Sequence, residues 1–146
     1  MSTDSSEERY EIPIAIDQSD IDVMGHVNNV VYLRWVQEAA VAHWNARATP
    51  DQQKKWKWVV VRHEIDYKRP AQYGEKIIAR TWVGQATDLT FERHTEILRA
   101  GDRKLLARAR TLWCPVNAQG GKPSRVDEDV RKRFSVPNDP VSTAHP

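Results

Sequence analysis

The sequence predicts an α+β domain in which an antiparallel sheet of about five strands wraps round one long central helix. Residues 30–46 (VVYLRWVQEAAVAHWNA) are apolar over most of a helical circumference, which indicates a buried helix. The second half of the chain contains alternating apolar and polar segments joined by short turns, which indicates strands. A sheet must cover its apolar face, and the long helix is the element available to do so.

The size and charge of the chain narrow the classes of protein. Its 146 residues correspond to one domain, and a net charge of +2 argues against a nucleic-acid-binding protein. A single cysteine cannot form an internal disulfide. No stretch approaches the roughly 18 apolar residues of a membrane helix, and residues 1–9 do not resemble a signal peptide. We therefore expect a cytoplasmic protein without a membrane or nucleic-acid partner.

The N-terminal half is expected to contain a strand, a loop and the central helix. Residues 10–17 (YEIPIAID) alternate in polarity, and Pro13 places this strand at an edge or a bulge, because proline cannot donate to a neighbouring strand. The following loop ends in Asn28 and Asn29, both favourable residues for a helix N-cap. The helix should therefore begin at residue 30.

The second half is expected to form an antiparallel meander. Phe91, Arg93, Thr95 and Ile97 share one face of a strand, because they alternate with polar or charged neighbours. The polar residues 51–58 should form an exposed approach to the strand that follows them in the chain. The expected strands are residues 57–68, 75–85, 89–98 and 104–115.

A short helix and two tails complete the expected domain organisation. Residues 124–134 should form a helix with Ser124 at its N-cap, since acidic residues come early and basic residues late. The polar residues 1–9 and the proline-rich residues 135–146 are interpreted as flexible tails. We therefore expect one domain that covers residues 10–134.

Two segments of the chain carry a resemblance to a known family. They are residues 20–38 (DIDVMGHVNNVVYLRWVQE) and residues 60–77 (VVRHEIDYKRPAQYGEKI). The first is similar to the signature, and the second to the second-strand region, of the 4-hydroxybenzoyl-coenzyme A thioesterase-like family of acyl-CoA thioesterases. The likeness spans residues 10–122. It implies the hotdog fold, hydrolysis of an acyl-CoA without a metal or other cofactor, and a homodimer or homotetramer whose active sites are built from two chains.

The resemblance places the catalytic carboxylate on Asp22 and the polarising backbone amide on Asn29. A carboxylate beside the start of a buried helix can attack the thioester carbon or deprotonate a water molecule. The unpaired N–H groups of the helix start can stabilise the oxygen that gains charge. The alternative for Asp22 is a loop residue that caps its own turn, as aspartate often does.

Three neighbouring positions are candidates for the substrate pocket, and His26 is a candidate for catalysis. Gly25 permits a turn and a close approach of the acyl group, while Val30 and Tyr32 offer apolar or aromatic surface at the helix start. Plant acyl-carrier-protein thioesterases carry a similar Asp-x-Asn-x-His-Val-Asn-Asn run, but Met24 stands where they have the asparagine before histidine. His26 is therefore either an active-site residue or a structural residue of the loop.

Other polar residues are interpreted as structural. Asp17 and Asp20 should bond within the loop, Glu38 either lines the pocket or faces solvent, and His63 and His94 lack partners at metal-ligand spacing. Cys114 is interpreted as a small buried hydrophobic residue. The tryptophans are assigned to the core or to an acyl tunnel. Candidates for the coenzyme A phosphates are Arg62, Lys68, Arg69, Arg93 and Lys122.

Nothing at the helix start supplies a charge for a charged acyl end, so a neutral acyl or aryl group is expected. The GHVNN form of the motif resembles fatty-acyl members of the family, which implies a medium-to-long-chain fatty acyl-CoA. Aroyl-CoA and acyl-carrier-protein thioesters remain alternatives. A hydratase or dehydratase on the same fold, and a non-catalytic acyl-binding module, also remain, since a fold does not dictate a function.

Overall fold

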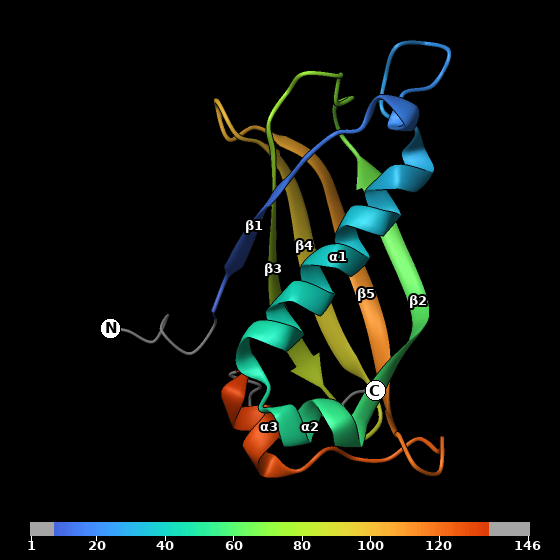
Figure 1. Cartoon of the computed structure of the whole chain (residues 1–146), viewed down its shortest axis with the longest axis vertical. Coiled ribbons are helices and arrows are strands. Elements are labelled where there is room, and N and C mark those ends of the chain that lie inside the picture. Colours follow the sequence, from blue (N-terminus) through green and yellow to red (C-terminus); the bar gives the residue numbers. More distant parts are fainter. Residues whose placement is uncertain (1–7, 135–146) are drawn as a thin grey trace.

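The computed structural model describes residues 8–134, so the predicted flexibility of residues 1–7 and 135–146 lies outside the described residues. The polypeptide forms a curved sheet, one long helix against its concave face, and two short helices at one end of the molecule (Figure 1). The elements are β1 (Tyr10–Ile14), a 3-10 turn (Gln18–Asp20), α1 (Asn29–Arg47), α2 (Pro50–Lys55), β2 (Trp56–Tyr67), β3 (Ile77–Ala86), β4 (Phe91–Arg99), β5 (Leu105–Asn117) and α3 (Glu128–Arg133).

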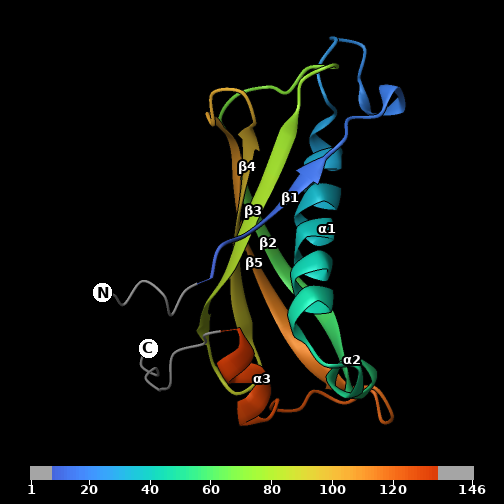
Figure 2. The same cartoon turned by 60° about the vertical axis from the view of Figure 1, so that its left-hand side comes forward.

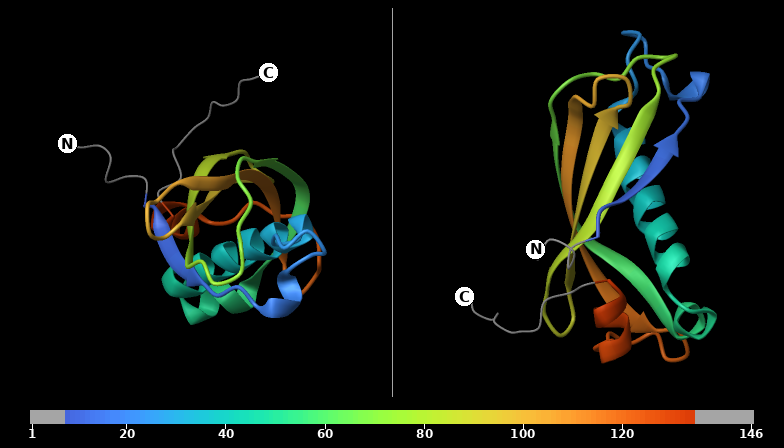
Figure 3. Two further views of the ribbon diagram at one scale, coloured as in Figure 1. Left: turned by 90° about the horizontal axis from the view of Figure 1, so that it is seen from above. Right: turned by 90° about the vertical axis from the view of Figure 1, so that its left-hand side faces the viewer.

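The sheet is antiparallel throughout and its strands lie in the order β1-β3-β4-β5-β2. Strands β3, β4 and β5 form the expected meander, and β1 and β2 are the two edges. Seen from the side and from above, the strands curve round α1 (Figures 2 and 3). The predicted α+β hotdog architecture, a five-stranded antiparallel sheet wrapped round a long central helix, is confirmed.

The inward face of the sheet follows the two-residue alternation of each strand. On β4, Phe91, Arg93, Thr95 and Ile97 are all buried, as the alternation predicts. Two apolar clusters fill the space between helix and sheet. One surrounds the first half of α1 and includes Trp35, and the other joins the C-terminal half of α1 to α3.

Helix α1 begins after Asn28, whose side-chain oxygen accepts a hydrogen bond from the Val30 N–H at 3.2 Å. Its buried residues form one face rather than the whole circumference. Val30 is 66% exposed and Val41 is 52% exposed. The expectation that the helix is buried around nearly its whole circumference is therefore wrong for a single copy of the chain. These two valines leave an apolar strip uncovered on the helix.

Several boundaries differ from the sequence-based expectations. The first strand ends at Ile14, and residues 50–55 form α2 instead of an extended approach. Thr49 and Gln52 cap the start of α2 reciprocally, with Pro50 at its first position, a combination that favours a helix. Helix α3 begins after Asp127, which caps Val130, and not after Ser124.

Residues 8 and 9, which the sequence places in the N-terminal tail, contact the folded domain. The Glu8 carboxylate lies 2.8 Å from Nε2 of His43 and accepts hydrogen bonds from Arg47. The Arg9 guanidinium lies 3.8 Å from the ring centre of Trp82. The contacts of the folded domain therefore extend at least to Glu8.

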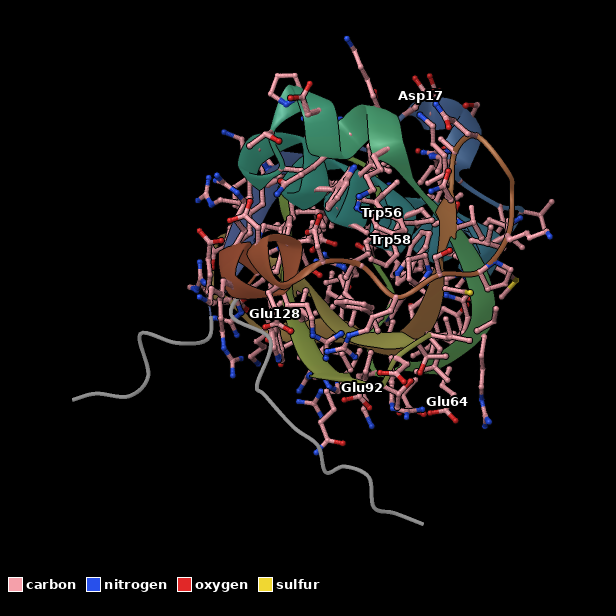
Figure 4. The ribbon with its side chains drawn as sticks, turned by 90° about the horizontal axis from the view of Figure 1, so that it is seen from below. Asp17, Trp56, Trp58, Glu64, Glu92 and Glu128 are labelled. Carbon is pink, nitrogen blue, oxygen red and sulfur yellow. The ribbon has the colours of Figure 1, made fainter. Side chains whose placement is uncertain are left out.

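The outer face of the sheet carries a ladder of paired charges that crosses four strands. Glu96 on β4 bonds Arg80 on β3 at 2.5 Å and lies 3.5 Å from Arg108 on β5. Arg110 on β5 bonds Glu92 on β4 and lies 3.4 Å from Glu64 on β2. Glu64 and Glu92 extend outward from the convex face in Figure 4.

Strand β2 pairs with β5 along its length, and its other edge faces outward. Val59 and Val61 lie exposed on this strand, next to a register shift between Val60 and Arg62. An exposed edge with apolar side chains is a template for pairing with another strand. In the described part of the chain, no helix is both long enough and apolar enough to cross a membrane.

Candidate active site

The loop before α1 is a closed turn held by its own backbone. Ile21 and Val27 form an isolated antiparallel bridge, and the Asp22 N–H donates to the His26 carbonyl at 2.7 Å. The Gly25 N–H donates to the Asp22 carbonyl at 3.0 Å. Gly25 has a φ of +82°, a conformation that residues with a Cβ rarely adopt, so glycine is required by the turn itself.

The Asp22 carboxylate uses one oxygen to hold this turn. Its Oδ1 accepts hydrogen bonds from the backbone N–H groups of Met24 at 2.9 Å and His26 at 3.2 Å. No donor within residues 8–134 bonds Oδ2, and the residue is half-buried. The turn-capping alternative is therefore true of one oxygen, while the other stays open for chemistry.

The start of α1 offers an amide hydrogen close in sequence to this loop. The N–H of Asn29 bonds no acceptor among the described residues, because Asn28 caps the next position. The Asn29 carbonyl accepts a hydrogen bond from the Tyr67 hydroxyl at 3.0 Å. Figure 1 shows the loop and this helix start together at one end of the molecule.

A second segment supports the loop from behind. The Tyr32 hydroxyl accepts a hydrogen bond from the Ala71 N–H at 2.9 Å, and the Val27 N–H donates to the Ala71 carbonyl at 2.9 Å. The rings of Tyr32 and Tyr67 pack edge to face at 5.3 Å. Tyr67 and Ala71 lie in the segment that resembles the family's second-strand region, but sequence reasoning gave neither a role.

The predicted pocket residues divide between surface and core. Val30 is exposed at the helix start, whereas Tyr32 is 1% exposed and its hydroxyl is already bonded. The expectation that both offer exposed surface is therefore wrong for Tyr32, whose burial follows from its packing against Trp35 and Tyr67. Val23 and Met24, at the tip of the loop, are exposed apolar residues that sequence reasoning did not select.

His26 is half-buried, and its backbone forms a bridge with Gln72. No residue between 8 and 134 makes a hydrogen bond with its imidazole. The ring therefore remains available for either of the two roles expected from the sequence.

Asp20 and Asp17 are loop-bonding residues, as predicted. Asp20 is 4% exposed and accepts hydrogen bonds from Arg34 at 3.0 Å and from the Asp17 N–H at 3.0 Å. The hydrogen bond from Arg34 lowers the pKa of Asp20, opposed by desolvation. Glu38 lies 3.4 Å from Arg34 and is half exposed, so it belongs to this ion-pair cluster and not to an apolar pocket.

The remaining histidines have protein partners. His63 bonds the Thr111 hydroxyl at 3.0 Å, and His94 stacks on Trp82 and lies 3.1 Å from Glu92. Among residues 8–134, no group of three or more metal-binding side chains forms. Both histidines therefore make contacts of the structural kind that the sequence predicts for them.

A buried polar chain at the other end of α1 was missed. His43 and Arg93 are buried, and Arg93 donates from Nη1 to His43 Nδ1 and to the Thr81 hydroxyl, each at 3.0 Å. Burial and the nearby guanidinium of Arg93 lower the pKa of His43 to about 4, and burial lowers the pKa of Arg93 to about 10. At neutral pH the imidazole is neutral and the guanidinium charged. The alternation of β4 already placed Arg93 on the inward face.

Comparisons with known proteins identify the family of the chain. The model of the thioesterase-like superfamily matches residues 16–134. A chloroplastic acyl-[acyl-carrier-protein] hydrolase of Cuphea viscosissima is 26% identical over 126 residues, covering 86% of this chain. The chain spans about 30% of the length of that relative.

Solved structures share the fold. A protein from Pseudomonas aeruginosa has a TM-score of 0.78 at 22% identity, covering 86% of this chain and 89% of its own. A 1,4-dihydroxy-2-naphthoyl-CoA thioesterase from Synechocystis has a TM-score of 0.76 at 20% identity, covering 95% of this chain and 100% of its own. At these identities the likeness establishes the architecture.

Proposed function

The chain belongs to the thioesterase-like superfamily, and from this premise we propose that it hydrolyses an acyl thioester with Asp22 as the catalytic carboxylate. One observation carries the proposal. Asp22 keeps one carboxylate oxygen unbonded by the described residues, in the turn that leads into a helix start where the Asn29 amide is also unbonded. A base or nucleophile and an oxyanion donor are the two groups that thioester hydrolysis needs.

The proposed reaction divides between these groups. Asp22 Oδ2 either attacks the thioester carbon or takes a proton from the water molecule that attacks it. The Asn29 N–H donates to the thioester oxygen as it gains negative charge. The thiolate leaves with a proton from solvent. If Asp22 is the nucleophile, a water molecule then hydrolyses the anhydride between the acyl group and Asp22, and by either route the free acid is released. Tyr32 and Tyr67 position the helix start without touching the reacting atoms.

We favour a medium-to-long aliphatic acyl group carried by coenzyme A. Exposed apolar side chains are present on the Asp22 loop and at the helix start (Val23, Met24 and Val30), so a neutral acyl group is preferred over a dicarboxylic one. The Cuphea relative is named for acyl carrier protein, which supports the carrier-protein thioester as the second candidate. The Synechocystis neighbour, named for a naphthoyl-CoA, keeps an aromatic acyl group as a further alternative.

We propose that the working unit is a homodimer or homotetramer. The outward edge of β2, the exposed Val59 and Val61, and the exposed valines of α1 support pairing through this side of the molecule. A second chain placed there would cover the loop and helix start and exclude water from the thioester.

A thiol-release assay tests the function. We expect octanoyl-CoA and palmitoyl-CoA to give higher kcat/KM than acetyl-, benzoyl- or succinyl-CoA, with activity preserved in EDTA. The matching acyl-carrier-protein thioesters, assayed in parallel, identify the carrier. Hydration of an enoyl-CoA without thiol release would overturn the proposal in favour of a hydratase. Absence of thiol release from every thioester, with a correctly folded protein, would leave the non-catalytic module.

A further inference from the structure

A cavity lies at the far end of α1 from the Asp22 loop. It has a volume of about 70 Å³, is partly open to the surface, and lies between the C-terminal half of α1, the inward face of the sheet and α3. Figure 4 looks into this end of the molecule, with Trp58 in the space bounded by α1, α3 and the strands. Its walls are mainly aromatic and aliphatic and include Trp44, Phe91, Val130 and Phe134.

One charged hydrogen-bond donor, Arg93, is among the residues that line this apolar cavity. Trp58 and Trp113 also line it, while their indole nitrogens are buried away from it without a partner among residues 8–134. The strand registers place the side chains of Arg93, Trp58 and Trp113 on one face of the sheet. Trp113 on β5 pairs with Phe91 on β4 and with Val60 on β2. Arg93 is two residues from Phe91, and Trp58 is two residues from Val60. Residues two apart on a strand share a face, so all three side chains are on the inward side of the sheet.

The guanidinium of Arg93 is incompletely paired. Its Nη1 donates to His43 and Thr81, both neutral groups, whereas its Nε and Nη2 meet no acceptor within residues 8–134. The Glu8 carboxylate reaches Arg93 through the imidazole of His43. A buried charge without a directly bonded counter-ion is costly, and an anion that completes its hydrogen bonds relieves that cost.

We propose that this cavity binds a small aliphatic monocarboxylate, with its carboxylate on the guanidinium of Arg93 and its alkyl group against the aromatic wall. A carboxylate satisfies the guanidinium, because its two oxygens can accept from Nε and Nη2 together. One water-sized group needs about 10–15 Å³ of such a cavity. A volume of about 70 Å³ therefore holds about six heavy atoms, as many as butyrate has. The apolar walls exclude strongly hydrated inorganic anions.

The cavity is separate from the proposed active site. Its α1 residues Ala40, Val41 and Trp44 lie at least eleven positions beyond Asn29, which corresponds to about 16 Å along the helix at 1.5 Å per residue. The proposal therefore does not depend on hydrolysis by Asp22. Binding measured directly tests it even if no thioester substrate is found.

The experiment is a titration with butyrate followed by the six indole N–H signals in proton–nitrogen NMR spectra, assigned with single Trp→Phe variants. We expect the Trp58 and Trp113 signals to shift saturably with a Kd of about 1 mM, as befits so small a ligand. The Trp35 signal should not shift. Butyramide, which has the same shape without the charge, should bind at least about tenfold more weakly.

Matched variants locate the ligand. Trp113→Phe and Trp58→Phe each shorten the aromatic wall against which the alkyl group packs, so each should weaken butyrate binding about threefold to tenfold. Trp56→Phe removes an equally unpartnered indole from the same apolar cluster but outside the cavity, and should bind butyrate normally. Asp22→Asn should also bind normally, which separates this site from the active site.

Arg93→Met should abolish binding while keeping the bulk of the side chain. If this variant does not fold, the two Trp→Phe variants carry the test without it. The proposal is overturned if butyrate shifts neither cavity indole, if butyramide binds equally well, or if Trp56→Phe weakens binding as much as Trp113→Phe.

Discussion

The hydroxyl of Tyr67 donates a hydrogen bond to the main-chain carbonyl of Asn29 at 3.0 Å, linking strand β2 to the first residue of helix α1. This bond fixes the backbone at the helix start, where the proposed oxyanion donor is located. Tyr67→Phe should therefore reduce kcat about threefold to tenfold with little change in KM, and lower the free energy of unfolding by about 1 kcal/mol. Tyr73→Phe, at an exposed tyrosine, is the control and should leave kcat unchanged.

Asp22→Asn should leave the fold intact and remove most of the turnover. The amide keeps its oxygen for the turn but can neither attack the thioester nor accept a proton, so kcat should fall by about 100-fold to 10,000-fold. Asp17→Asn changes another loop carboxylate, one that caps the 3-10 turn, and should retain turnover. Circular dichroism confirms that both variants are folded. Wild-type kcat in Asp22→Asn would refute the assignment.

His26→Ala should reduce kcat less than Asp22→Asn does. The histidine backbone holds the turn through bonds that alanine preserves, while its imidazole has no bonding partner among the described residues. The measurement is kcat of both variants with the same best substrate. A larger loss in His26→Ala would shift the mechanism toward an imidazole-centred one, as in the plant-type motif.

Acidification should destabilise the protein through His43. Its pKa is about 4 in the folded state and about 6.5 unfolded, so between these values the unfolded chain binds more protons and the free energy of unfolding falls as the pH falls. Protonated His43 would face the charged Arg93 and lose its acceptor at Nδ1, while Glu8 and Arg47 lie on its other side. From pH 7 to 4.5 we expect a loss of about 2 kcal/mol from this group.

Urea denaturation at both pH values measures this loss. His43→Gln can still accept from Arg93 and donate to Glu8 but does not titrate, so its loss of stability over the same range should be smaller by about 2 kcal/mol. His94→Gln, on the outer face of the sheet, is the control and should behave as the wild type does. Equal pH dependence in wild type and His43→Gln would refute the assignment to His43.

A charge on the free edge of β2 should break the proposed oligomer. Val61→Lys places an ammonium group on an exposed position of the strand, where pairing with a second chain would bury it. Light scattering at micromolar concentration should give a dimer or tetramer for the wild type and a monomer for the variant. Leu89→Lys, an exposed apolar position in the β3–β4 turn, should remain oligomeric. A monomeric wild type would count against the assembly.

The architecture was predictable because its signals are periodic. The alternation of Phe91, Arg93, Thr95 and Ile97 gives the inward face of β4, and the apolar run of residues 30–46 gives the central helix. The boundaries depend on single caps, and there the sequence is ambiguous. Both Ser124 and Asp127 are favourable N-caps, and only the packing of α3 selects Asp127.

The site was predictable only where it is local in sequence. Asp22, Gly25 and Asn29 lie within one loop and helix start, so a single motif includes them. Tyr67 reaches Asn29, and Arg93 reaches His43, across strands that are far apart in the chain. Such pairings depend on strand register, which one sequence does not specify. Tyr32 is buried by its contacts with Tyr67 and Ala71, which are also distant from it in the chain.

The ion pairs of Glu96, Arg80, Arg108, Glu92 and Arg110 disfavour packing of the outer face of the sheet against the sheet of another copy. Laying a second sheet flat on this face would strip water from every pair at once, and the attraction within each pair does not offset that penalty. Growth by layers is therefore disfavoured, whereas joining by strand edges leaves the ladder hydrated. An oligomer that forms through the edge of β2 leaves the convex faces of its sheets exposed to water. We expect these charged faces not to associate with one another, so the oligomer should have a defined size.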